Sequence, residues 1–79
     1  MTEHNTRTYY RGHSLEWGMR NAQESGLILK MMDETGTHFV SAQGDREKIV
    51  ATLTQDTVTR EYVLRVSEDY VQSMLRKGW

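Results

Sequence analysis

The sequence predicts an α+β fold, in which an antiparallel β-meander of about five to six short strands is covered by a C-terminal α-helix. Turn-forming residues interrupt the chain at intervals of about ten residues from Arg7 onward, which is typical of a meander. Residues 58–66 alternate in the manner of a half-buried strand, and the residues after Ser67 have the apolar spacing of a helix. If 14–25 and 45–54 are helical instead, the alternative is a ferredoxin-like βαββαβ order with an additional C-terminal helix.

The first elements are predicted to form a β-hairpin. Residues 7–11 and 14–19 flank Gly12-His13, and glycine adopts the positive φ that a type II′ turn needs. Leu15, Trp17 and Met19 occupy alternate positions, which favours a strand. The competing interpretation is a helix over 14–25 that ends at Gly26, although Trp17 then falls off its apolar stripe.

The middle of the chain is predicted to contain three strands. The run Leu27 to Met32 is apolar except for Lys30, which is typical of a central strand covered on both faces. A turn over 33–36 leads to a strand over 37–42. Residues 48–54 are rich in β-branched side chains and favour a further strand, although a helix capped by Asp45 is also compatible with them.

The C-terminal residues are predicted to pass from a strand over 58–66 into a helix over 67–77. Ser67 can act as the N-cap, and acidic residues at the start and basic residues at the end suit the helix dipole. The apolar stripe consists of Tyr70, Val71, Met74 and Leu75. A helix this short is marginal alone, so we expect it to pack on the sheet.

Length and composition set the class of protein. The 79 residues make one domain, with residues 1–6 as a flexible N-terminal tail and residues 7–79 as a single small α+β domain. Cysteine is absent, which excludes disulfides and thiolate metal sites and favours a cytoplasmic location. The N-terminal residues do not resemble a signal peptide, and no apolar run is long enough to span a membrane. The formal net charge of −1 lacks the strongly basic character of most nucleic-acid-binding domains.

No motif indicates catalysis or a cofactor. His4, His13 and His38 share no metal-binding spacing, so we expect no metal. The chain has no nucleophile elbow and no phosphate-binding loop. The pairs Asp33-Glu34 and Glu68-Asp69 are better explained as a turn and a helix start. We therefore expect a protein that is not an enzyme.

The function predicted is a small interaction protein, of the type found among bacterial and phage accessory proteins, that binds another macromolecule through a sheet face or edge. The partner can be an unknown protein or a second copy of the chain, as in a homodimer. Aromatic residues, methionine and arginine are enriched at interfaces, so the predicted partner-binding residues are Tyr9, Tyr10, Arg11, Met32 and Trp79. The alternative is a single-stranded nucleic-acid-binding domain, because aromatics flanked by arginines can stack on bases; its residues are Arg7, Tyr9, Tyr10, Arg11 and His13.

Overall fold

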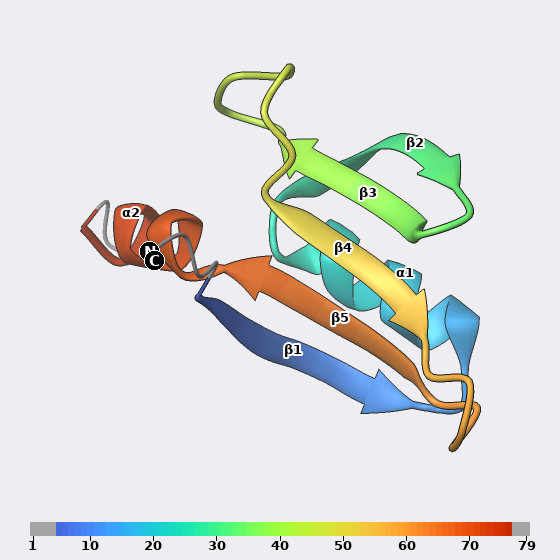
Figure 1. The fold of residues 1–79 in the computed structure, drawn as a ribbon. Coiled ribbons are helices and arrows are strands. Elements are labelled where there is room, and N and C mark those ends of the chain that lie inside the picture. Colours follow the sequence, from blue (N-terminus) through green and yellow to red (C-terminus); the bar gives the residue numbers. More distant parts are fainter. Residues whose placement is uncertain (1–4, 77–79) are drawn as a thin grey trace.

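The computed structural model describes residues 5–76, which form one antiparallel sheet and two helices (Figure 1). The strands run in the spatial order β1-β5-β4-β3-β2, so four consecutive strands form a meander and β1 pairs beside the last of them. Their bounds are β1 Thr6–Gly12, β2 Leu27–Asp33, β3 Gly36–Ser41, β4 Ala51–Gln55 and β5 Tyr62–Ser67. The helices are α1 Leu15–Glu24 and α2 Glu68–Arg76. The α+β class and the five antiparallel strands confirm the predicted fold class.

The predicted hairpin at the N-terminus is wrong, because residues 15–24 form α1 and not a strand. Ser14 begins the helix by accepting a hydrogen bond from the backbone N–H of Trp17. Gly26 follows the helix with a φ of 79°, as the competing helical interpretation predicts. The apolar Trp17 completes the alternating pattern that favours a strand, but in the structure its side chain lies on the exposed face of the helix.

The ferredoxin-like alternative is also wrong, because its second helix is not formed. Residues 51–55 pair on both sides as β4, in agreement with the predicted strand. The loop before β4 is tied to the sheet by the Val50 N–H, which donates to the carbonyl of Phe39 at 2.9 Å.

Strand β2 was predicted to be central, but it lies at an edge of the sheet and pairs only with β3. The other edge is β1, which pairs with β5. Each edge strand contains a register shift of the kind that marks a β-bulge, between Thr8 and Tyr10 in β1 and between Leu29 and Met31 in β2. Bulges in edge strands discourage pairing with other chains.

Strand β5 begins later than predicted, at Tyr62, because residues 57–61 belong to the loop between β4 and β5. The Asp56 carboxylate accepts hydrogen bonds from the backbone N–H groups of Val58 and Thr59, and these bonds lower the pKa of Asp56 below its ordinary value. Arg60 completes the turn with a φ of 67°. These local bonds replace the strand pairing that the alternating sequence suggested.

The core lies between the sheet and its two helices. In Figure 1, α1 crosses behind the sheet and α2 lies beyond the end of β5. The core side chains are Ala22, Leu27, Phe39, Val50, Ala51, Leu53, Leu64, Val66, Tyr70 and Val71. Helix α2 thus supplies two buried residues to the core, and its Met74 packs against them while Leu75 stays exposed.

The predicted N-cap of α2 is wrong, because within residues 5–76 the Ser67 hydroxyl makes no hydrogen bond. The strand instead passes directly into the helix. The Ser67 N–H donates to the Val50 carbonyl at 2.7 Å, and the Glu68 N–H donates to the Asn5 carbonyl at 3.0 Å. Backbone carbonyls therefore satisfy the N–H groups of Ser67 and Glu68 at the junction of strand and helix.

Candidate functional site

The four predicted residues of β1 are separated by the two faces of that strand. Tyr10 packs against the core, and its hydroxyl donates to the Ser14 carbonyl at 3.0 Å. Tyr9 lies at the bulge and is exposed, so it is the freer of the two tyrosines. The Tyr9-Tyr10 pair therefore does not form a two-ring stacking platform.

Both arginines of β1 are paired with carboxylates. The Arg7 guanidinium donates from Nη2 to Glu68 Oε2 at 2.7 Å and from Nε to Glu68 Oε1 at 3.2 Å. Hydrogen bonds from the Gln72 amide and then from Arg7 lower the pKa of Glu68 below its ordinary value. Arg11 pairs with Glu61 at 3.3 Å. A phosphate would have to compete with these carboxylates, which weakens the nucleic-acid interpretation.

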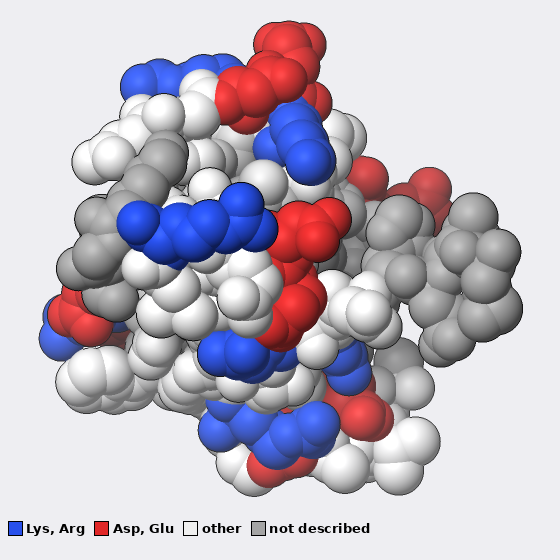
Figure 2. All heavy atoms as spheres, turned by 90° about the vertical axis from the view of Figure 1, so that its left-hand side faces the viewer, with Lys and Arg blue, Asp and Glu red and all other residues white. Residues whose placement is uncertain are grey.

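Among the described residues, the surface at the α2 end of the molecule also shows no basic footprint. Figure 2 shows Lys and Arg residues interleaved with Asp and Glu residues on this side. This pattern agrees with the formal net charge of −1. A nucleic-acid interface would instead require basic groups gathered along one track.

The remaining predicted residues that the structure describes are His13 and Met32, and Met32 lies far from the β1 group. His13 lies between β1 and α1, and Met32 is on β2 at the opposite edge of the sheet. Trp79 lies outside the described residues. Of the predicted partner-binding residues that the structure describes, those of β1 and Met32 therefore lie on opposite edges of the sheet and do not form one surface.

The β2 edge is the most apolar exposed strand of the sheet. Its side chains Leu29, Met31 and Met32 are 46%, 41% and 68% exposed. The bulge places Met32 opposite Thr37 and Met31 opposite His38, so the two methionines lie on different faces of the sheet. Helix α1 packs against β1, β2 and β5, yet it leaves these β2 side chains uncovered.

A groove of about 380 Å³ opens where the start of α1 meets the β2–β3 turn. We call it the Met32 groove. Apolar atoms are supplied by Leu15, Met32, Leu53 and Tyr62. The β2–β3 turn with its flanking residues and the end of β4 complete the groove: Asp33, Glu34, Thr35, Gly36, Thr37, Thr54 and Gln55. Sequence reasoning identified Met32 but missed Leu15, because Leu15 was assigned to a strand and its neighbours in the groove come from three other strands.

The turn at the rim of the groove is held by a hydrogen-bonded network. The Thr35 hydroxyl and His38 Nε2 both bond to Asp33 Oδ1, the latter at 3.0 Å. An ionised carboxylate only accepts hydrogen bonds, so Nε2 carries the proton and Nδ1 faces the Thr52 hydroxyl at 3.1 Å. These bonds, with that from Thr35 the strongest, lower the pKa of Asp33 to about 2. The rim therefore keeps its negative charge at neutral pH.

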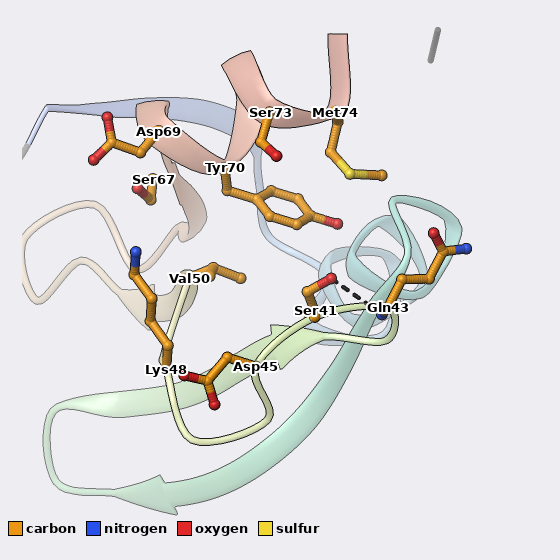
Figure 3. A pocket seen from close by; sticks show the side chains of 11 residues that line it. Ser41, Gln43, Asp45, Lys48, Val50, Ser67, Asp69, Tyr70, Ser73 and Met74 are labelled. Carbon is orange, nitrogen blue, oxygen red and sulfur yellow. Dashed lines mark hydrogen bonds between the residues drawn. The ribbon is translucent and has the colours of Figure 1, made fainter. Parts of the chain in front are cut away.

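A second cavity, of about 170 Å³, lies between α2 and the loop before β4 (Figure 3). Figure 3 shows Tyr70 extending from α2 into this space, with Lys48 and Asp45 contributed by the loop. Its apolar lining residues Val50 and Tyr70 are buried in the core, whereas Met32 and Leu15 in the Met32 groove are largely exposed. This cavity therefore offers a partner less uncovered apolar surface than the Met32 groove does.

Two further properties bear on the chemistry of the site. Within residues 5–76, no three His, Asp or Glu side chains gather closely enough to hold a metal ion. Neither described helix has the length and apolar character needed to cross a membrane.

No family model, curated protein or solved structure matches this chain.

Proposed function

We propose that the protein is a small, non-enzymatic interaction module that binds another macromolecule through its β2 edge and the adjoining Met32 groove. The observation that carries this proposal is the exposure of Leu29, Met31 and Met32 on an edge strand. Exposed apolar side chains of this kind mark surfaces that contact other proteins, and here the side chains make the contact because the β2 bulge discourages backbone pairing.

The contrast between the two edges supports the choice of β2. The β1 edge carries Arg7 and Arg11, and both are satisfied by carboxylates of the same chain. The β2 edge carries apolar groups that gain free energy when another surface covers them. Methionine adds adaptability, because its flexible thioether side chain can fit partners of different shape.

Single-stranded nucleic-acid binding is less well supported as the function. Tyr10 is packed against the core, and the two β1 arginines are already paired. A salt titration with an oligonucleotide tests it, because phosphate contacts weaken as the salt concentration rises. The absence of cysteine suits a partner in a reducing compartment such as the cytoplasm.

The experiment compares two charge substitutions at exposed apolar positions. Met32→Asp introduces a carboxylate at the β2 edge, whereas Leu75→Asp introduces one on α2, and Leu75 is also more than half exposed. We expect the wild type and Leu75→Asp to recover the same partner from a lysate of the source cells, and Met32→Asp to lose it. Equal recovery by both variants, or no recovery by the wild type, would count against the proposal.

A further inference from the structure

We propose that the Met32 groove binds a basic protein segment that carries an apolar anchor residue. This inference rests on the proposed interaction function and names the chemistry of its partner. The structure supports it through the apolar floor of the groove and the charge of its rim.

The floor can accept one apolar side chain. Met32 is 68% exposed and Leu15 is 44% exposed, while Leu53 is buried beneath them and Tyr62 is partly buried. These four side chains come from α1, β2, β4 and β5, so the floor is built on elements that the core holds in place. An inserted leucine- or phenylalanine-sized group would cover the exposed parts of Met32 and Leu15.

The charged residues that line the groove are all acidic. Asp33 and Glu34 line the groove, and no lysine or arginine is among its lining residues. The side chain of Glu34 makes no hydrogen bond or ion pair within residues 5–76. Asp33 is held in place by its hydrogen bonds to Thr35 and His38, so the rim of the groove carries two acidic side chains, Asp33 and Glu34.

This combination selects among classes of macromolecule. A lysine or arginine beside the anchor residue would meet the carboxylates at the rim, and such complementarity both steers encounter and fixes register. Phosphate groups of nucleic acid or of a lipid surface would instead be repelled. The groove therefore favours a cationic protein segment.

The test uses a random peptide library displayed on phage, selected on the wild-type protein and counter-selected on Met32→Asp. We expect the recovered peptides to combine lysine or arginine with a large apolar residue. A synthetic copy of the best peptide should shift the NMR signals of Leu15, Met32, Leu53 and Tyr62. The folded state of each variant is checked from the dispersion of its own spectrum.

Charge reversal measures the role of the rim. Glu34→Lys should weaken binding of that peptide by about two- to fivefold, as expected for an exposed ion pair, and Met32→Asp by at least about tenfold. Glu47→Lys is the matched control, since Glu47 is an exposed acidic residue of the loop before β4, outside the groove, and it should leave the affinity unchanged.

Several outcomes would overturn the inference. These are the selection of neutral or acidic peptides, shifts that map away from the groove, an equal effect of Glu34→Lys and Glu47→Lys, or no enrichment at all. A homodimer that Met32→Asp dissolves would show that a second copy of the chain is the occupant. If Met32→Asp still loses the lysate partner while no basic peptide binds, the proposed function stands and only this inference fails.

Discussion

At the scale of single residues, Gly18 brings α1 close to the sheet. A Cβ placed on Gly18 would lie 3.1 Å from Leu53 Cδ1 and 3.3 Å from Tyr10 Cδ2, both closer than ordinary van der Waals contact. Sequence patterning could not identify Gly18 as a core position, because a residue without a side chain has no hydrophobic signature. The face of α1 that packs on the sheet is therefore wider in the structure than the apolar residues of the sequence indicate.

We expect Gly18→Ala to destabilise the protein by about 1 kcal/mol. Alanine gains about 1 kcal/mol of helix propensity over glycine, whereas overpacking of a tight contact costs about 1–3 kcal/mol. Leu53 is only 2% exposed and touches the added methyl group with both of its terminal carbons, so we expect the packing cost to exceed the gain.

Urea unfolding measures this difference, with Gly44→Ala as the control. A Cβ on Gly44 would meet Ser41 at 3.4 Å, which is ordinary contact, so the control should change stability by less than about 0.5 kcal/mol. If Gly18→Ala were more stable than the wild type, the Leu53 side chain would have to move to make room for the added methyl group.

Asp33 should make stability depend on pH. Its pKa falls from an ordinary value of 3.8 to about 2 in the folded protein, so the unfolded chain binds the proton more readily. The resulting stabilisation is present above pH 4 and is lost as the pH falls from about 4 to about 2. We therefore expect Asp33→Asn to be less stable than the wild type at pH 7, and the difference to shrink in acid.

Unfolding measured between pH 7 and pH 2 provides this comparison, and an NMR titration of the Asp33 carboxyl carbon reads its pKa directly. Thr35→Val removes the strongest of the hydrogen bonds that lower this pKa, so it should move the pKa back toward its ordinary value. An unchanged pKa in Thr35→Val would contradict the assignment of the hydroxyl as the main cause.

At the scale of elements, the sequence contains residues typical of the beginning and end of α1, but an apolar residue on the exposed face of the helix favoured a strand instead. Ser14 and Gly26 are ordinary boundary residues for a helix, and the structure uses both. Trp17 misled the interpretation because it is apolar and yet exposed, with Arg20 placed 4.8 Å from its ring centroid. That contact is an interaction on the helix surface which periodicity cannot distinguish from burial.

The Ser14 cap should contribute measurably to α1. The Ser14 hydroxyl accepts from the Trp17 N–H at 3.1 Å, and the backbone at Ser14 has the extended φ and ψ of an N-cap. Ser14→Ala should lower the free energy of unfolding by about 1 kcal/mol, while Ser14→Gly should lower it by only a few tenths. Equal losses in the two variants, measured by chemical denaturation, would argue against a capping role.

At the scale of the whole molecule, the order of the strands could not be obtained from local pattern. The apolar run of β2 predicted a central strand, but pairing places β2 at an edge and β5 in the interior. The Met32 groove exists only because this topology brings the start of α1 beside the end of β2. The enrichment of methionine at interfaces pointed to Met32, whereas the location of the groove required the tertiary structure.

Tyr70 joins the two helices across the core. It is buried, and its hydroxyl donates to the Ser25 carbonyl at 3.2 Å, so α2 is tied to the end of α1. Tyr70→Phe should cost about 1 kcal/mol, because the ring still packs while the Ser25 carbonyl loses its partner. Hydrogen exchange should show faster opening of α2 in this variant, and unchanged exchange would contradict the link.

Lys30 should limit association through the β2 edge. It lies in the bulged part of the strand, and its ammonium group reaches the Arg46 carbonyl at 3.5 Å. A charged residue at a bulge is a common protection of an edge strand, and the net charge of −1 gives little general repulsion between copies. Lys30→Ile would extend the apolar run of Leu29, Met31 and Met32 without interruption.

Sedimentation velocity at matched concentrations should therefore give a larger average mass for Lys30→Ile than for the wild type. Lys30→Arg keeps the positive charge and should behave as the wild type does. If Lys30→Ile shows the same mass as the wild type over the whole concentration range, the bulge alone protects the edge. The free energy that β2 offers to a partner would then come from the Met32 groove and not from the strand backbone, because the bulge would still block pairing when the charge is gone.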